Sequence, residues 1–175
     1  MKIRNGLLTL LLFVLAAAGM ASGQATRTYS LINGDSLVPA SGFDDGSGFT
    51  TFFGGSINGQ VANATAPAVF TLSVAFKESG EVDAAGNYIG TILAPNSSFA
   101  VTESAGRKSV STSGRINSGT VTYRLIDGRA EVISVVSGDL TVWEGKNKSR
   151  KAVGTGTLDY GTSVEGSGTM VLNFF

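Results

Sequence analysis

The sequence predicts an all-β fold: a single antiparallel β-barrel or β-sandwich of about ten short strands, preceded by a helical signal peptide. Three observations support this fold class. Apolar and polar residues alternate with a period of two over several stretches of the chain. The 24 glycines, about twice ordinary usage, separate these stretches. No stretch after the N-terminal segment has the period of an amphipathic helix.

The first 23 residues have the three parts of a secretory signal peptide. Lys2 and Arg4 form a basic region, residues 7–18 an apolar run, and residues 21–23 a small-residue cleavage site. The apolar run is short of the roughly 20 residues that a helix needs to span a bilayer. We therefore expect a cleaved signal peptide in preference to a retained membrane anchor, and we expect no transmembrane helix in the mature chain.

Cleavage at this site predicts a mature chain that starts at Gln24, with cleavage after Ala25 as the alternative. Residues 24–175 have the size of one domain, and no linker among them is long enough to separate a second. The protein is therefore expected to be exported. We favour a secreted or periplasmic location over the outer membrane.

The composition limits the classes of function. The chain has no cysteine, so its stability has to come from a hydrophobic core, for which 42% hydrophobic residues are sufficient. It has 13 basic and 13 acidic residues. Such a near-neutral chain has no overall attraction for nucleic acid, and we predict no nucleic-acid partner.

A hairpin that turns at Asp127-Gly128 is the strongest local prediction, because a type I′ turn needs positive φ at both central positions. A two-residue loop places Arg124 opposite Glu131 on one face of the hairpin. On the other face, the same register places Tyr123 opposite Val132. We expect this second face to belong to the core.

The same register places two apolar residues, Ile133 and Val135, on the supposedly outer face, opposite Thr122 and Thr120. We expect both to be buried, as in a two-layer sandwich or a closed barrel. A second turn is predicted at residues 137–139, with a third strand that ends at Trp143. Two- and three-residue loops are both compatible with the sequence there, so the face that carries Trp143 is left open.

The remaining elements follow from alternation and from turn residues. Residues 68–77 have the cleanest alternation and are predicted to form a central core strand. The other predicted elements are a hairpin at Asn33-Gly34 between residues 27–32 and 36–38, a loop at 39–48, strands at 49–53 and 56–61 around Gly54-Gly55, strands at 88–93, 99–103 and 108–116, a turn at 95–98, a basic loop at 144–151, and strands at 152–160 and 164–175.

The last two strands each contain a Gly-x-Gly sequence, at Gly154 and Gly156 and at Gly166 and Gly168. Glycine inside a strand often indicates bending or the close approach of another backbone. We therefore expect the sheet to curl at this hairpin.

The absence of histidine and cysteine excludes Ser-His-Asp and Cys-His nucleophile systems and the usual zinc and copper sites. A pair of carboxylates such as Glu131 and Glu144 could still serve a glycosidase if the two approach across neighbouring strands. We favour solvent-exposed carboxylates, with Glu131 paired to Arg124. We predict no catalytic residue, no metal and no cofactor, and we lean against an enzyme.

Two pairs of residues are candidates for ligand binding, one acidic and one aromatic. Asp44 and Asp45 lie in a glycine-rich stretch with oxygen ligands suitable for calcium, although an ordinary acidic turn explains them better. Trp143 and Tyr160 flank neighbouring strands and are candidates for a sugar-stacking platform. Placement in the core, or simple strand propensity, is the favoured alternative for both aromatic residues.

The basic loop contributes the remaining candidate binding residues. A local basic patch of this kind can meet an anionic polysaccharide or a lipid headgroup. We favour a charged loop that keeps the protein soluble, because no aromatic residue lies between the basic ones. The basic residues are Lys146, Lys148, Arg150 and Lys151.

The leading functional hypothesis is an exported, non-catalytic β domain that acts as an extracellular or periplasmic binding or structural module. Its candidate partners are a polysaccharide or another envelope protein. The first alternative is a small outer-membrane β-barrel, which the terminal Phe175 favours and the shortness of most strands opposes. The second is a calycin-like barrel that carries a small apolar ligand in a hollow interior.

Overall fold

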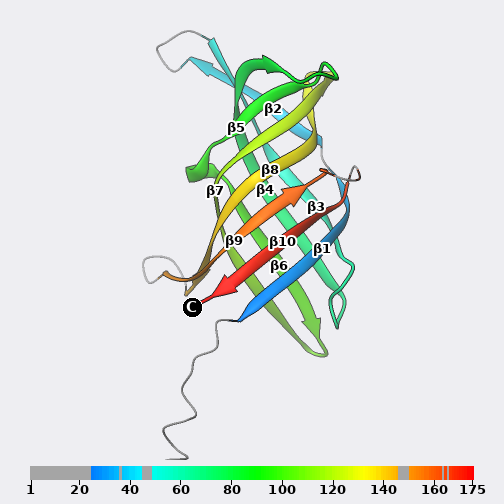
Figure 1. Cartoon of the computed structure of the whole chain (residues 1–175), viewed down its shortest axis with the longest axis vertical. Coiled ribbons are helices and arrows are strands. Elements are labelled where there is room, and N and C mark those ends of the chain that lie inside the picture. The colour runs from blue at the N-terminus through cyan, green and yellow to red at the C-terminus, as the bar shows by residue number, and fades with distance from the viewer. Residues whose placement is uncertain (1–24, 36, 45–48, 146–149, 163, 165) are drawn as a thin grey trace, which may run out of the picture.

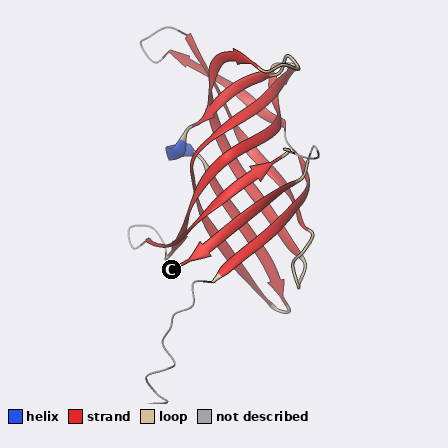
Figure 2. Cartoon of the chain, viewed as in Figure 1, coloured by secondary structure: helices blue, strands red, loops and turns tan. Residues whose placement is uncertain are grey.

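The fold of the chain is given by a computed structural model, which describes residues 25–35, 37–44, 49–145, 150–162, 164 and 166–175. All strands in this part of the chain pair in antiparallel fashion and belong to one sheet. Figure 2 shows strands throughout, with one short helical turn between them. The predicted all-β class is therefore confirmed. The predicted signal peptide, residues 1–23, lies outside the described residues.

Ten strands and one turn of 3₁₀ helix make up the described part of the chain (Figure 1). In chain order they are β1 (Thr26–Asp35), β2 (Leu37–Asp44), β3 (Phe49–Val61), β4 (Ala68–Val82), β5 (Tyr88–Ile92), η1 (Ala94–Asn96), β6 (Ser98–Ala105), β7 (Lys108–Ile126), β8 (Arg129–Glu144), β9 (Lys151–Tyr160) and β10 (Gly168–Phe174).

The sheet closes into a ring. In the lower part of Figure 1, the pairings run from β1 through β10, β9, β8, β7, β6, β4 and β3 and return to β1. In the upper part, β2 lies between β8 and β3, and β5 lies between β4 and β7. The long strands β3, β4, β7 and β8 take part in both circuits. One curved sheet therefore surrounds one core.

The core lies inside the ring because alternate residues of each strand point inward. Strand β4 shows this pattern most clearly, as predicted: Phe70, Leu72, Val74 and Phe76 are buried, and the residues between them are more exposed. Full burial of a side chain of this size contributes about 1.5–3 kcal/mol. The inward face of the ring is thus the main source of stability.

Aromatic rings fill the upper part of this core. Phe53 of β3 lies opposite Phe76 of β4, with ring centroids 5.3 Å apart, and Tyr123 of β7 lies 5.0 Å from each of them. Tyr88 of β5 is paired with Tyr123, and their rings stack at 5.6 Å. The space enclosed by β3, β4, β5 and β7 is therefore occupied by packed side chains.

The hairpin at Asp127-Gly128 is confirmed. Both residues have positive φ, 48° and 74°, as a type I′ turn requires, and Ile126 pairs with Arg129 across a two-residue loop. Arg124 lies opposite Glu131, and the two side chains form an ion pair. On the other face, Tyr123 and Val132 are both buried.

The second predicted turn, at residues 137–139, is wrong because β8 runs through it without reversing. Ser137 has a φ of 53°, and the register shifts on both sides of β8 near this point, which marks a β-bulge. A left-handed residue followed by Gly138 fits a bulge as well as a turn. The segment 120–143 is accordingly one hairpin with long arms, and does not form three strands.

The register beyond the hairpin tip also differs from the prediction. A shift between Thr122 and Tyr123 inserts one extra residue into β8, so that Val135 lies opposite Val121. This bulge moves Val135 onto the inner face, where it is buried, while Ile133 is half-buried. The predicted pairings of Val135 with Thr120 and of Ile133 with Thr122 are therefore wrong. The predicted burial is confirmed for Val135 and is only partial for Ile133.

The predicted hairpin at Asn33-Gly34 is also wrong. Strand β1 continues through both residues, and β1 and β2 pair with other strands. A Cβ atom on Gly34 would lie 2.9 Å from the Ile57 side chain and even closer to the Tyr160 hydroxyl. The glycine therefore permits a close approach inside the ring, and the dipeptide pattern could not distinguish this from a turn.

Two further predicted boundaries are wrong because the strands continue through them. Gly54-Gly55 does not separate two strands, because β3 continues through it with β4 as partner. The predicted loop at residues 39–48 is strand β2 as far as Asp44, and residues 45–48 lie outside the described part. A closed ring gives each strand partners on both sides, and this pairing overrides local glycine signals.

Two glycines of β9 lie where the backbone of β10 approaches closely. A Cβ atom on Gly156 would lie 2.8 Å from Cδ2 of Leu172 and closer still to the Val171 carbonyl oxygen. Gly154 would contact the Asn173 carbonyl at 2.5 Å. Gly166 has a φ of 75° and precedes β10, so it belongs to the connection between the strands.

Candidate functional site

Trp143 lies on the outer face of the sheet. It is half-buried and follows the buried Val142 of β8, so that the two side chains point to opposite faces. It lies opposite Ser113 of β7 and Ala152 of β9. Trp143 thus points outward, an orientation that the sequence alone left open.

The residues beside Trp143 in the same cross-strand row are small. Ser113 lies opposite Ala100 of β6, and Ala100 lies opposite Thr71 of β4. Residues in register share a face of the sheet. The indole is therefore the largest side chain of its row, and the short side chains beside it leave the surface of the sheet uncovered there.

The next outer row is polar over the same strands. In this row, Ser98 of β6 lies between Ser73 of β4 and Arg115 of β7. On its other side, Arg115 lies opposite Thr141 of β8. Arg115 is exposed. Hydroxyl groups and a guanidinium thus lie directly beside the row that contains Trp143.

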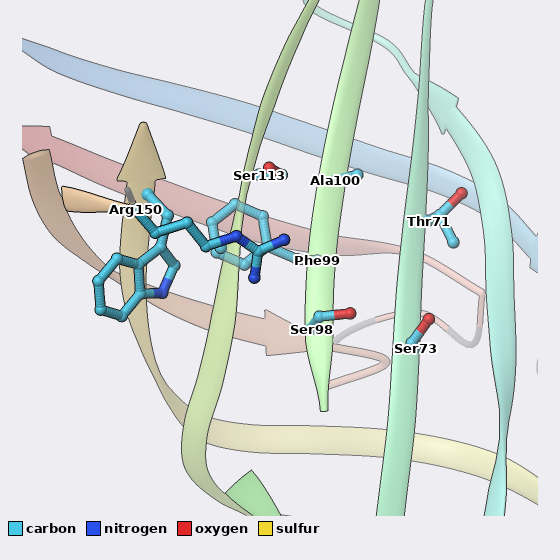
Figure 3. Close-up of a pocket in the computed structure, with 9 residues that line it drawn as sticks. Thr71, Ser73, Ser98, Phe99, Ala100, Ser113 and Arg150 are labelled. Atoms are coloured by element: carbon cyan, nitrogen blue, oxygen red, sulfur yellow. The ribbon is translucent and has the colours of Figure 1, made fainter. Parts of the chain in front are cut away.

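These two rows form a hollow of ≈ 250 Å³ on the outer surface. Figure 3 shows Arg150 reaching across β7, with the Phe99 ring behind that strand and Ser98, Ser73 and Thr71 along β6 and β4. An adjoining hollow includes Asn96 of η1 and Arg115. Trp143 and Arg150 line both, and we refer to the two together as the Trp143 hollow.

The Trp143 hollow is positively charged. Arg115 and Arg150 have no ion-pair partner among the residues that the structure describes. A guanidinium stays protonated at all ordinary pH values and offers five N–H donors. The site can therefore bind an anion, donate and accept hydrogen bonds through its hydroxyls, and stack a ring or an apolar face on the indole.

The structure brings together only part of the predicted basic patch. Arg150 lines the Trp143 hollow, and Lys151 begins β9 as an exposed residue opposite Glu144. Lys146 and Lys148 lie outside the described residues.

The predicted platform of Trp143 with Tyr160 does not form. Tyr160 is fully buried inside the ring, where its ring centroid lies 6.3 Å from that of Phe70. Of the two favoured alternatives, core placement is correct for Tyr160, whereas the half-buried Trp143 is an outward strand residue, as strand propensity allows. The two residues face opposite sides of the sheet, so they cannot contact the same ligand.

The acidic candidates do not assemble into a site in the described part. Asp44 ends β2 opposite Phe49, and Asp45 lies outside the described residues. Within the described ranges, no group of three or more acidic side chains is arranged to hold a metal ion.

The carboxylate pair of Glu131 and Glu144 cannot approach across neighbouring strands, because both belong to β8. They lie near opposite ends of that strand, about 40 Å apart at the usual rise per residue. Glycosidase carboxylates lie within about 10 Å of each other. Glu131 instead pairs with Arg124, as expected.

A second hollow, at the lower opening of the ring, is held together by contacts within the protein. Glu103 accepts a hydrogen bond of 3.1 Å from the Tyr29 hydroxyl and lies 3.8 Å from Arg27. The side chain of Asn63 bonds the backbone of β1 at Thr28 and Ser30, both at 2.8 Å. Because these polar groups already have partners, this hollow is a weaker candidate than the Trp143 hollow.

The sequence did not indicate most residues of the Trp143 hollow. Ser73, Ser98, Ser113 and Arg115 occupy outward positions of three strands, and only the register brings them together. The serine and threonine residues that alternate with apolar residues in these strands were the one available signal.

Comparison with known proteins gives no match to a family model, to a curated protein or to a solved structure. Within the described residues, no helix is long and apolar enough to cross a membrane.

Proposed function

We propose that the mature protein is an exported, non-catalytic binding module that contacts its ligand with the outer surface of the sheet. The observation that carries this proposal is the Trp143 hollow. It combines an accessible indole, hydroxyl side chains and two guanidinium groups on the outer face. These groups bind through stacking, hydrogen bonds and charge.

The chemistry of the hollow favours binding over catalysis. Its lining residues are serine, threonine, asparagine, tryptophan and arginine, together with glycine, alanine, proline and phenylalanine. Arginine does not lose its proton and so does not act as a general base. Serine is a weak nucleophile unless a neighbouring base activates it, and no carboxylate lines the hollow.

Packing of the interior favours an outer site over an internal one. Phe53, Phe76 and Tyr123 lie with ring centroids 5.0–5.3 Å apart, and Leu72 and Leu158 are fully buried beside other apolar residues. A carrier for a small apolar ligand needs an unfilled cavity of a few hundred Å³. We propose a filled, closed barrel that serves as a scaffold.

The outer face favours an aqueous environment over a lipid one. Outward positions of β9 and β10 carry Thr155, Thr157 and Thr169, which are exposed. A transmembrane barrel has the opposite pattern, with an apolar outer band and a polar interior. We therefore propose a secreted or periplasmic protein in preference to an outer-membrane one.

Fractionation of cells that express the full chain, followed by N-terminal sequencing of the product, tests this proposal. We expect the protein in the periplasm or the medium, soluble without detergent, with Gln24 or Thr26 as first residue, depending on which cleavage site is used. Recovery in the cytoplasm with an intact N-terminus would contradict the proposal. Recovery only in detergent would favour the outer-membrane alternative.

A further inference from the structure

We propose that the Trp143 hollow binds an acidic polysaccharide, a sugar chain that bears carboxylate or sulfate groups. This ligand class rests on the proposed function, because such polymers occur outside the cytoplasm and meet the outer face of an exported module. Three features of the hollow support it independently: the indole, the hydroxyl rows and the two arginines.

The indole supplies the stacking surface. Trp143 is half-buried, so its base is fixed by the sheet while part of the side chain stays accessible. Its row neighbours, Ser113 and Ala152, are too small to cover it. Amphipathic ligands with one apolar face, such as sugar rings, pack on exposed aromatic rings of this kind.

The hydroxyl rows supply polar contacts along a line. Ser98 lies on β6, two strands away from Trp143 on β8, and Thr71 and Ser73 lie on β4, three strands away. Each hydroxyl both donates and accepts hydrogen bonds, as sugar hydroxyls do. Three strand spacings correspond to about 14 Å, so the hollow fits a stretch of chain in preference to a single sugar ring.

The arginines give the hollow its preference for an anion. Arg115 projects from the row beside Trp143, and Arg150 lines both parts of the hollow. Neither has an ion-pair partner within the described part of the chain. A guanidinium binds a carboxylate or a sulfate through two parallel hydrogen bonds. A neutral sugar would leave both charges unmatched.

Other anionic partners fit the hollow less well. Single-stranded nucleic acid needs several aromatic side chains for successive bases, whereas Trp143 is the only tryptophan of the chain and the other lining aromatic residue, Phe99, is buried. An acidic peptide would use the arginines without the indole and the hydroxyl rows. An acidic sugar chain uses all three features.

Calorimetric titration of the purified mature protein with three polymers tests the ligand class. Polygalacturonate offers sugar rings with carboxylates, fully methyl-esterified polygalacturonate offers the same rings without charge, and polyglutamate offers carboxylates without sugar. We expect binding of polygalacturonate at least tenfold tighter than of either control, with an affinity that falls as salt is added. Dextran sulfate, compared with dextran, tests sulfate in the same way.

Substitutions locate the binding. We expect Trp143→Ala and Arg150→Ala each to weaken binding of polygalacturonate roughly tenfold or more. The matched control is Arg129→Ala, which removes the same charge from an exposed position at the other end of β8. Arg150 lies outside the core, so its variant is informative even if the loss of Trp143 disturbs the sheet. Thermal unfolding confirms that each variant is folded.

Each contrary result overturns a defined statement. Equal binding of polyglutamate would show bare charge attraction and overturn the sugar-specific proposal. Equal binding of the methyl ester would overturn the acidic class. Absence of binding to every polymer, or an equal loss in Arg129→Ala, would also overturn the inference. None of these results touches the proposal of a secreted or periplasmic protein, which fractionation tests separately.

Discussion

Where strands β4, β6, β7 and β8 pass the Trp143 hollow, their two faces differ sharply, although residues one position apart supply them. One cross-strand row on the inner face is apolar, and all of its residues except the glycine are buried. The neighbouring row on the outer face consists mostly of small or polar residues beside a single indole. The inner row is Leu72, Phe99, Gly114 and Val142, and the outer row is Thr71, Ala100, Ser113 and Trp143.

We propose that this difference separates stability from recognition. Inner residues gain free energy by leaving water, so their replacement should affect unfolding. Outer residues stay near solvent, so their replacement should affect ligand binding while leaving the fold intact. Substitution of adjacent residues on the same strand can therefore test the division directly.

The largest effect is expected from Leu72→Ala, because Leu72 is fully buried and its truncation leaves a cavity. The free energy of unfolding should fall by about 2–5 kcal/mol. Ser113→Ala, an outer-row change, should alter it by no more than about 0.5 kcal/mol. Urea unfolding of both variants measures the difference, and equal losses would contradict the assignment of the two faces.

The second effect concerns a glycine of the inner row. A Cβ atom on Gly114 would lie 2.6 Å from the Phe99 ring and would contact the Thr141 carbonyl oxygen more closely still. Gly114→Ala should therefore lower the free energy of unfolding by about 1–3 kcal/mol. The control is Gly54→Ala in β3, where the added carbon would meet only the Val74 carbonyl at 4.0 Å. Similar losses in both variants would contradict the proposed crowding.

The third effect appears only at high pH. Burial, with the Glu78 carboxylate as the next cause, raises the pKa of Tyr123 to about 12, whereas an unfolded chain leaves tyrosine near 10. The folded state thus favours the neutral phenol. The contribution of the neutral Tyr123 phenol to the free energy of unfolding should be complete below about pH 10 and should be lost as the pH rises from about 10 to 12.

Urea unfolding of the wild type and of Tyr123→Phe over that pH range tests this expectation. The variant removes the titrating group and retains the ring that packs on Phe53 and Phe76. Its stability should therefore fall less steeply with pH than that of the wild type. Identical slopes would mean that Tyr123 does not cause the alkaline loss.

The smallest effect is expected at the ion pair of Arg124 and Glu131, which lies on the outer face near the hairpin tip. Arg124 is half-exposed, so solvent and salt weaken the attraction. A double-mutant cycle with Arg124→Ala and Glu131→Ala should give a coupling of about 0.2–1 kcal/mol that shrinks at high salt. A coupling of several kcal/mol would contradict this assignment.

Local sequence signals predicted those elements whose partners are close in sequence. The alternation of residues 68–77 predicted the core strand β4, and Asp127-Gly128 predicted the tip of the hairpin between β7 and β8. Asn33-Gly34 and the Ser137-Gly138-Asp139 segment carry similar signals but lie inside strands. In both cases a long-range neighbour in the ring, Tyr160 for Gly34 and Leu158 for Gly138, explains the glycine.

Only part of the candidate site was predictable from the sequence. Trp143 and Arg150 were candidates because of their residue type alone. Ser98 and Arg115 were not, because they face the hollow only through the pairing of β6 with β7 and of β7 with β8. The bulges in β8 shift that register, and the sequence pattern did not reveal them.

Fluorescence of Trp143 tests the central claim most directly, because it is the only tryptophan in the chain and lines the Trp143 hollow. Acrylamide should quench the free protein. Polygalacturonate should protect Trp143 from this quenching in proportion to binding, and added salt should reverse the protection. Quenching that is unchanged at a polymer concentration where calorimetry shows saturation would place the ligand elsewhere and contradict the assignment of recognition to this face.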